Sequence, residues 1–444
     1  MIKTSNQEKL LFLQLNELNM DIIKNYVKDS NKKFLGFQKL FSLKDFSFSC
    51  EEKYEELEPW IQWVSINTGK RFKEHKIFRL GDIINSDIKQ IYEIVEENNY
   101  RVGCLSPMNT ANKLKNPEYF IPDPWTDTKP DPSFFSRIIH DVLTQTVNDN
   151  AVGKIKTSSL LKLAVIFFYF ARLINISTYL RLVVKSFSGK WNKALFLDLL
   201  LSDIHIKLAK KKNIDFSTVF LNGFAHIQHH YFNASSFSKS TSTLPAWYIK
   251  EDEDPISDAI EIYDRILHQH FEVFPDYKFI VCTGLTQKPY LNPVYYYRPI
   301  DHEAFLDALS IKYKKVSPRM TRDFLLEFNN MEEQKDCLFK LDNLMDANGL
   351  NVFDIDIRDS SLFVTLSYPH QINKDTIFIY QGKSLNLFKH VAFVALKSGE
   401  HMNKAFAFLS DEFDSNIFDS KESNNVTILF NVISSFFKPY SPSE

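Results

Sequence analysis

Short apolar runs that end abruptly in polar residues recur along the chain. The first is Leu10–Leu15, which stops at Asn16-Glu17-Leu18-Asn19. Buried parallel strands have this pattern, because helices cover both of their faces and polar residues gather where the strand ends. Further candidate strands of this kind are Lys76–Leu80, Tyr100–Leu105, Val219–Leu221 and Phe279–Cys282.

Helical patterns lie between these strands. Asp21–Val27 follows the first strand, and the amphipathic segment Ile84–Asn98 precedes the run that begins at Tyr100. Strands that alternate with helices predict an α/β protein with a mostly parallel central sheet flanked by helices. In such sheets ligands bind beyond the carboxyl ends of the strands, so the polar residues found there become candidates for a site.

The final third of the chain alternates short strands with polar turns, which predicts a smaller, partly antiparallel β section that completes the sheet. Its candidate strands are Leu362–Leu366, Thr376–Tyr380 and Val391–Ala395. We therefore divide the chain into three parts. Residues 1–150 form the first half of the α/β domain with the site loops, 151–213 a basic helical insertion, and 214–440 the remainder of the α/β domain.

The insertion stands out by its long helical stretch, Ser158–Lys212, and by its charge. Between Lys154 and Asn213 the chain has twelve Lys and Arg and two Asp, a net charge of +10, whereas the whole chain has −2. Its most apolar run, Leu160–Phe170, is too short for a bilayer, which takes about 20 residues. Two interpretations stay open: helices that pack on the sheet, or a basic surface in peripheral contact with anionic lipid or a lipid-linked glycan.

Composition narrows the classes of partner and location. A net charge of −2 argues against nucleic acid as a partner. The four cysteines are scattered without metal-ligand spacing and are expected to be reduced, buried thiols. Residues 1–19 have the pattern of a first strand rather than of a secretory signal. We therefore expect a cytoplasmic protein, either free or peripheral at the inner membrane.

Carboxylates and histidines near the strand ends are the first candidates for chemistry. Glu17 follows the first strand, and Glu58 opens the segment EPWIQWVSINTG. Either alone is an ordinary exposed Glu, but two carboxylates at one sheet edge can ligate a cation or divide acid and base roles. His226, His229 and His230 are spaced to present two imidazoles from one helix face to a metal. The alternative is a helix cap or a solvated face.

Aromatic and loop residues are candidates for substrate contact. Trp63 suits either the core or a platform for a sugar ring. Asn109 and the loop Tyr119–Thr128, which carries Asp123, follow a predicted strand. Functional groups concentrate on loops held by a rigid scaffold; the alternative is that Asp123 caps a turn in a rigid surface connection.

The order of these residues resembles that of a known family. Glu17 follows the first strand, Glu74-His75 follows Asn67-Thr68-Gly69, and Asn222-x-x-x-His226 and Gly399-x-His401 come later. This order resembles the type I phosphodiesterase and nucleotide pyrophosphatase branch of the alkaline phosphatase superfamily, over most of the chain. The resemblance implies an alkaline-phosphatase-like fold and places Glu17, Asn222, His226 and His401 at metal-ligand positions.

Two departures from the family pattern change the expected chemistry. Where the family has a nucleophilic Thr or Ser, this chain has Glu58-Pro59-Trp60, and where it has Ser-Asp-His-Gly, this chain has Thr283-Gly284-Leu285-Thr286. Two ligands of a second metal are therefore missing, and two cations need several carboxylates and histidines to offset their mutual repulsion. We expect one divalent ion (Zn, Mn or Mg) or none.

The resulting hypothesis is an enzyme of altered mechanism. It would act as a transferase or hydrolase on a phosphate, sulfate or glycosyl linkage, with Glu58 and Glu17 as catalytic residues. The resemblance also suggests bacterial capsule or lipopolysaccharide assembly, with a phosphorylated, glycan, nucleotide-sugar or lipid-linked substrate. Substrate contact is assigned to Trp63, His75, Asn109, Asp123, His229 and His230.

Two alternatives to this hypothesis stay open. One is a catalytically inactive binding or assembly protein that keeps the fold, because a fold does not guarantee chemistry. The other is a conventional metal-dependent hydrolase whose motifs are aligned differently from the correspondence above.

Overall fold

The computed structural model describes residues 8–152, 157–238, 244–318, 322–413 and 424–438. The chain forms two compact units. Tyr290–Gly399 belongs to the second unit, and the first comprises the described residues up to 238, residues 245–289 and those from 400 onward. The boundaries predicted at 150/151 and 213/214 stay predictions, whereas the sequence did not indicate a separate unit at 290–399.

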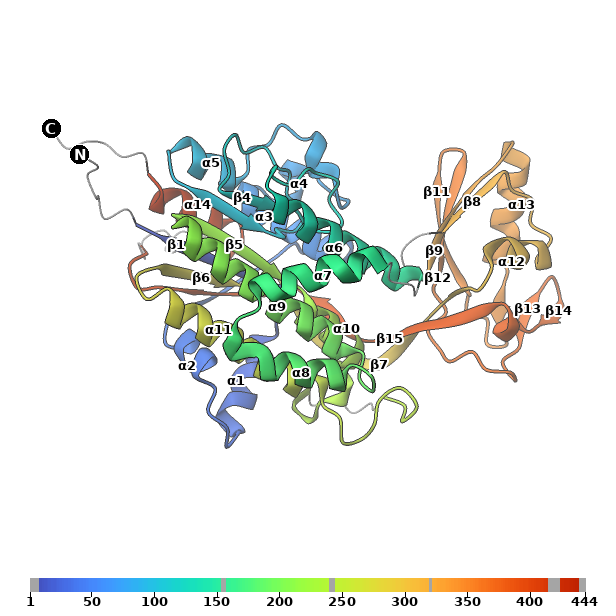
Figure 1. Ribbon diagram of the computed structural model, residues 1–444. Coiled ribbons are helices and arrows are strands. Elements are labelled where there is room, and N and C mark those ends of the chain that lie inside the picture. Colours follow the sequence, from blue (N-terminus) through green and yellow to red (C-terminus); the bar gives the residue numbers. More distant parts are fainter. Residues whose placement is uncertain (1–7, 153–156, 239–243, 319–321, 414–423, 439–444) are drawn as a thin grey trace, which may run out of the picture. The chain divides into compact units, whose positions relative to one another are not determined.

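The first unit is built on a seven-stranded sheet in the order β2-β16-β6-β1-β5-β3-β4 (Figure 1). The five strands from β6 to β4 are parallel, and β16 and β2 extend one edge in antiparallel fashion. This confirms the expected α/β class. The strands are β1 Leu10–Leu15, β2 Lys44–Phe48, β3 Val102–Leu105, β4 Tyr119–Ile121, β5 Phe216–Leu221, β6 Lys278–Cys282 and β16 Ala405–Leu409.

Alternate side chains of each strand point to opposite faces of the sheet. On one face Leu10 and Phe12 share a buried cluster with residues of three helices, which are α3 (Pro59–Thr68), α5 (Ile91–Glu97) and α14 (Ile428–Phe436). On the other face Ser217 of β5 bonds His205 of α9 (Trp191–Lys212). The central strands are therefore covered on both sides, which explains their uninterrupted apolar runs.

Further helices pack around α9 on this second face. They are α10 (Gly223–Tyr231), α11 (Pro255–Val273) and α8 (Ile176–Lys185), with α7 (Thr157–Phe170), η3 (Leu173–Asn175) and α6 (Phe134–Val152) before them in the chain. The insertion is helical, as its sequence predicts; its residues 153–156 lie outside the described chain. The remaining longer helices, α1 (Met20–Asp29) and α2 (Leu35–Phe41), follow β1.

The second unit has its own buried core and three small sheets, two of them antiparallel throughout and the third a strand pair, β7 with β15. Its elements are β7 Thr286–Pro299, α12 His302–Ala308, β8 Lys315–Pro318, β9 Asp323–Glu327, α13 Met331–Asp342, β10 Met345–Asp346, β11 Phe353–Arg358, β12 Ser361–Leu366, β13 Phe378–Tyr380, β14 Lys383–Leu385 and β15 Val391–Met402. The prediction that this section completes the central sheet is wrong, because the three predicted strands lie in β12, β13 and β15, outside that sheet, whereas β16, which joins it, was not predicted. Alternation marks a strand without saying which sheet it joins.

Two local predictions also need correction. Lys76–Leu80 is not a strand: it follows the short helix α4 (Phe72–His75), and Lys76 has a left-handed backbone with φ of 58°. The helix expected over Ile84–Asn98 is confined to Ile91–Glu97, where Gln90 and Glu93 form a capping box. A reciprocal cap of this kind fixes where a helix begins.

Candidate metal centre

Glu17 lies two residues beyond β1, between the ends of β5 and β6. Its φ is 60°, a conformation that costs a non-glycine residue about 1–3 kcal/mol and persists only where neighbours enforce it. The neighbours of Glu17 do so, because its N–H donates to Thr283 O at 2.8 Å and Gln228 Nε2 donates to Glu17 O at 2.7 Å. The backbone is thus held at both polar groups, and the carboxylate is fixed at the sheet edge.

Two histidines from distant parts of the chain meet this carboxylate. Glu17 Oε2 lies 3.0 Å from His229 Nε2 and 3.1 Å from His401 Nε2. One ligand atom from each residue lies within 4.8 Å of the others. His229 comes from α10 and His401 from the end of β15, within the first unit. Three residues that can bind a metal therefore converge on one point.

Amide side chains fix the orientation of the Glu17 carboxylate. Asn16 Nδ2 donates to Glu17 Oε1 at 2.8 Å and also to Asn222 Oδ1 at 2.8 Å. Gln287 Nε2 donates to Glu17 Oε2 and to Ala225 O. Such partners around a carboxylate are typical of a preorganised site, because they leave the ligand atoms little freedom.

The electrostatics of the cluster keep Glu17 ionised. Burial of the side chain, which is 2% exposed, by itself raises the pKa of the carboxyl. The charges of His401 and His229 and their hydrogen bonds outweigh it, so that the pKa lies well below its ordinary value. The carboxylate is therefore deprotonated, as a metal ligand has to be, whereas the two histidines lower its pKa as imidazolium ions and would have to release those protons to bind a metal.

The donor set and its surroundings fit a single divalent cation. A carboxylate with two imidazoles is a set that binds Zn²⁺ and related transition ions, whereas Mg²⁺ favours oxygen ligands. Among the described residues, the buried Oε1 of Gln287 has no hydrogen-bond donor. A buried acceptor left this way beside the cluster is satisfied by a cation or an ordered water.

Glu58 lies on the other side of the His401 ring. Its Oε2 is 3.7 Å from His401 Nδ1, and its side chain is 32% exposed. Glu58 immediately precedes α3, with Pro59 as the first helical residue. His401 therefore has Glu17 near one ring nitrogen and Glu58 near the other, the latter at a distance longer than a hydrogen bond.

The structure does not bring His226 or His230 to the cluster. His226 is exposed, and its ring lies against that of His230, with centroids 4.6 Å apart. The ring of His229 instead lies 5.1 Å from that of His401. Asn222 accepts from Asn16, which in turn donates to Glu17. Spacing along α10 allowed either His226 or His229, and the packing of the helix selects His229.

Two other predicted site residues have structural contacts. His75 is buried, accepts from Ile77 N at Nδ1 and contacts Ser65 Oγ at 3.1 Å; burial lowers its pKa to about 4. Asn109 accepts from Gly81 N and donates to Trp60 O. Both tie loops to the helices α3 and α4, and their assignment to substrate stays a prediction.

Asp123 serves as the anchor of its own loop. It accepts hydrogen bonds from the backbone N–H groups of Asn109, Trp125 and Thr126 and from the Thr126 hydroxyl. Burial raises its pKa to about 6, and these hydrogen bonds act in the opposite direction. The contacts agree with the turn-capping alternative.

The Thr283-Gly284 turn accommodates Trp63. Gly284 has φ of 72°, and a Cβ placed there would lie 2.7 Å from Trp63 Cε2. Trp63 is fully buried and donates from Nε1 to Asn16 Oδ1 at 2.8 Å. Its indole therefore belongs to the core and supports the cluster through Asn16. With Trp63 in place, position 284 has no room for a metal-binding side chain.

Residues that sequence reasoning missed are the amides around Glu17: Asn16, Gln228 and Gln287. Asn16 carried a signal, because it precedes Glu17 at the end of a buried strand. Gln228 and Gln287 carried none, since each is an ordinary polar residue in sequence and becomes buried only through the tertiary packing.

The fold and the cluster together define an α/β protein with a candidate one-metal centre at the carboxyl edge of its parallel sheet. No family model matches the chain, and no curated protein matches it. Solved structures do overlap with it. Murine ectonucleotide pyrophosphatase/phosphodiesterase 5 shares 10% identity, with 97% of this chain and 95% of that chain covered and a TM-score of 0.42.

Two further structures overlap to a similar extent. Phosphonoacetate hydrolase from Sinorhizobium meliloti 1021 has 8% identity, coverage of 97% and 96%, and a TM-score of 0.41. Alkaline phosphatase PafA has 11% identity, coverage of 98% and 96%, and a TM-score of 0.44. Overlaps this weak carry no conclusion about chemistry, which has to come from this chain's own residues.

Proposed function

We propose that this protein is a hydrolase or transferase that holds one divalent metal ion between Glu17, His229 and His401 and acts on a phosphate-bearing substrate. The observation that supports this is the convergence of the three donors at 3.0 and 3.1 Å where α/β sheets bind ligands. When bound, a divalent ion supplies Lewis-acid stabilisation of charge on a phosphoryl group.

Side chains of the protein orient the metal ligand and accept the proton. Asn16 and Gln287 hold the Glu17 carboxylate. Glu58 is the partly exposed carboxylate beside the cluster and is our candidate to accept a proton from the attacking hydroxyl or water. The absence of a Ser or Thr at this position is consistent with direct attack by the acceptor. The proposal thus retains the altered mechanism expected from the sequence.

The finer assignment rests on the sequence resemblance alone. It comprises a role in surface-polysaccharide assembly in the cytoplasm and a glycan, nucleotide-sugar or lipid-linked substrate. It remains part of the proposal, and turnover of such substrates tests it separately from the metal centre.

Glu58→Gln is the central test, because it separates a catalytic from a positioning role. We expect turnover of aryl phosphate mono- or diesters, measured with Zn²⁺ or Mn²⁺, to fall at least about 100-fold. Metal affinity, measured by equilibrium dialysis, should stay within about threefold of the wild type. A joint loss of affinity and turnover would instead make Glu58 a positioning residue for His401, whose loss typically costs about 10–100-fold in metal affinity.

Chelation and reconstitution provide the control for metal dependence. Removal of the metal should abolish turnover, and addition of Zn²⁺ or Mn²⁺ should restore it. Metal binding without turnover of any phosphate, sulfate or glycosyl substrate would favour the inactive binding protein. Full turnover in metal-free protein would contradict the proposed centre.

A further inference from the structure

The helices α7 and α8 carry an exposed apolar surface. On α7, Leu161 and Phe168 are seven residues apart, close to two helical turns, and on α8 Leu180 and Val184 are four apart. Leu173 lies between the helices and Phe187 just after them. Their exposed fractions are 67% for Leu161, 85% for Phe168, 90% for Leu173, 64% for Leu180, 69% for Val184 and 89% for Phe187. We call these six residues the α7–α8 apolar surface.

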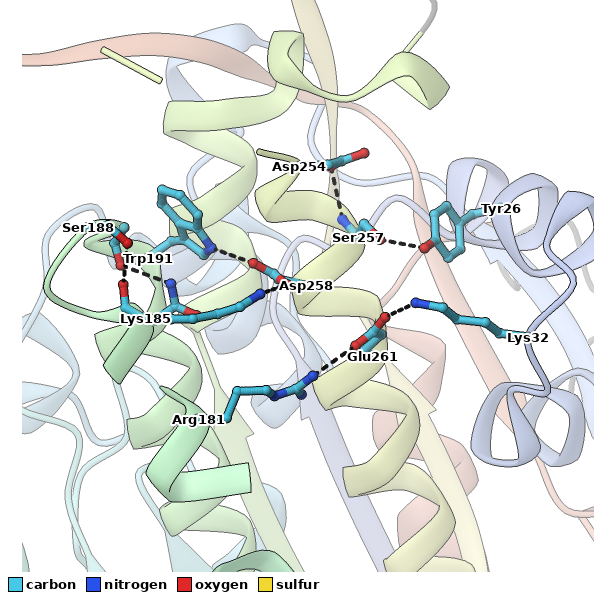
Figure 2. A network of polar contacts seen from close by, with 12 residues as sticks. Tyr26, Lys32, Arg181, Lys185, Ser188, Trp191, Asp254, Ser257, Asp258 and Glu261 are labelled. Atoms are coloured by element: carbon cyan, nitrogen blue, oxygen red, sulfur yellow. Dashed lines mark hydrogen bonds and ion pairs between the residues drawn. The ribbon is translucent and has the colours of Figure 1, made fainter. Parts of the chain in front are cut away.

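The opposite side of α8 is the side that packs on the protein. Thr178, Tyr179 and Leu182 are buried. Figure 2 shows that Arg181 and Lys185 reach from α8 to acidic residues of α11, namely Glu261 at 3.4 Å and Asp258 at 3.0 Å. Trp191 Nε1 also donates to Asp258. The flanking basic residues are thus used to fasten the helix, and the apolar residues are turned away from the fold.

The turn between the two helices is fixed from inside the protein. Asp203 accepts from Arg172 N at 2.8 Å, from Asn175 Nδ2 at 2.8 Å and from the Tyr179 hydroxyl at 2.9 Å. Gln269 Nε2 donates to Asn175 Oδ1. Asp203 and Asn175 are fully buried. The bend of 114° between the helices is therefore held by a hydrogen-bonded network.

This bend bears on how the pair can meet a membrane. Among the described residues no single helix has the length and apolar character to cross a bilayer, and only the bent pair meets that criterion when its parts are taken together. Helix α7 has 14 residues and α8 has 10, whereas a span takes about 20. A pair of short helices with a fastened bend suits the surface of a bilayer rather than its interior.

The charged residues near the α7–α8 apolar surface indicate what this surface binds. Lys190 and Lys193 lie at the start of α9, soon after Phe187; both are exposed, and neither has an ion-pair partner in the part of the chain that the structure describes. Interfacial helices combine exposed Phe and Leu with neighbouring Lys, and Lys near an anionic bilayer contributes about 1 kcal/mol each. Protein interfaces, in contrast, are depleted in Lys.

We infer that the α7–α8 apolar surface docks the protein on an anionic lipid bilayer. The two helices lie in the headgroup region, with Phe168, Leu173 and Phe187 entering the acyl boundary and Lys190 and Lys193 facing the lipid phosphates. Docking of this kind requires neither the metal centre nor the proposed reaction.

The test is sedimentation of the full chain with vesicles of phosphatidylglycerol and phosphatidylcholine, and with vesicles of phosphatidylcholine alone. The wild type should bind the anionic vesicles more tightly, and added salt should weaken binding. Leu173→Ser with Phe187→Ser should reduce the partition coefficient at least about tenfold, since two large side chains no longer enter the bilayer. Lys190→Gln with Lys193→Gln should reduce the preference for phosphatidylglycerol.

The matched control is Leu291→Ser with Phe339→Ser. These side chains of the second unit are 81% and 65% exposed, and their loss should leave vesicle binding unchanged. Equal thermal midpoints for all variants show that the fold is retained. No binding of the wild type to anionic vesicles, or equal binding by the Leu173/Phe187 variant, overturns the inference. A wild-type dimer that the same variant converts to a monomer, without vesicle binding, overturns it in favour of a second copy of the chain.

Discussion

Glu17 illustrates how much a single position can depend on its neighbours. Its backbone is left-handed, its carboxylate is buried, and its partners come from β15, α10 and β7 as well as from Asn16. His229, His401 and Gln287 all contact Oε2, and Asn16 donates to Oε1, so the cluster is specified as a unit rather than as a sum of pairs. Substitutions that keep size and change only one ligand atom are the sharpest tests at this scale.

His229→Gln should weaken Zn²⁺ binding by more than about tenfold, because it removes one of three ligands. His226→Gln is the matched control: the residue lies on the same helix, is exposed, and its ring packs edge-to-face against that of His230. Titration with Zn²⁺ by calorimetry compares the two variants. Equal losses in both, or a loss only in the His226 variant, would contradict a ligand set that contains His229.

Gly284→Ala should lower the free energy of unfolding by about 2–4 kcal/mol. About 1 kcal/mol reflects the positive φ, and the rest comes from overlap of the new Cβ with Trp63. Gly81→Ala is the control, because Gly81 has φ of 89° and nothing within 4 Å of a Cβ. Gly81→Ala should cost only the contribution of the positive φ, about 1 kcal/mol. Denaturant unfolding measures both, and equal costs would show that Trp63 shifts without penalty.

At the scale of elements, a chain of buried hydrogen bonds joins β4, β5, α9 and α11. His270 Nδ1 bonds Ile266 O, a carbonyl, so this nitrogen carries the proton and His270 Nε2 accepts from His205 Nδ1. His205 Nε2 then accepts from the Ser217 hydroxyl, which is left to accept from Tyr119. Every donor has an acceptor only when both imidazoles are neutral.

These hydrogen bonds between His270, His205, Ser217 and Tyr119 predict an acid-sensitive contribution to the stability of the fold. Burial lowers the pKa of His270 to about 4 and lowers the pKa of His205 well below its ordinary value. The unfolded chain therefore binds these protons more readily. The contribution is complete above about pH 6.5 and is lost as the pH falls toward 4.

The pH effect is measured as a difference between variants, because Asp123 and Asp198 act with the opposite sign. Burial raises both of their pKa values to about 6, so they favour the folded state as the pH falls. The wild type should lose more stability between pH 7 and 5 than a His205→Gln/His270→Gln variant does, in denaturant unfolding at each pH. Equal pH dependence of the unfolding free energy in the two proteins would contradict the inference that His205 and His270 are neutral in the folded state.

At the scale of the whole molecule, each of the two units has a buried core cluster of its own. One includes the sheet of the first unit, and the other lies among β9, β12 and α13 of the second. Since the residues of each cluster belong to one unit, calorimetry should show two unfolding transitions. Leu362→Ala in β12 should destabilise only one of them, and Leu13→Ala in β1 only the other, each by about 2–5 kcal/mol. A single transition shifted by both variants would show that the units unfold together.

Much of the first unit was accessible from the sequence because its signals are local. A strand buried on both faces is a continuous apolar run, and Leu10–Leu15 was predicted with the bounds that the structure gives it. The polar residues beyond such strands pointed to a sheet edge where Glu17 and His401, two of the predicted ligands, lie close to His229 in the structure.

The tertiary structure alone decided what depends on contacts between distant segments. It brings His229 rather than His226 to Glu17, because the face that α10 turns toward Glu17 is fixed by packing and not by spacing. The fold brings Gln287, which is 270 residues from Glu17 in sequence, into hydrogen-bonding contact with the Glu17 carboxylate. It also packs Trp63 against Gly284. It also assigned the late strands to a second unit, because alternation determines a strand but pairing determines its sheet. The sequence by itself thus determined the class of fold and pointed to the edge with the candidate site, while the atoms that meet there followed from the packing.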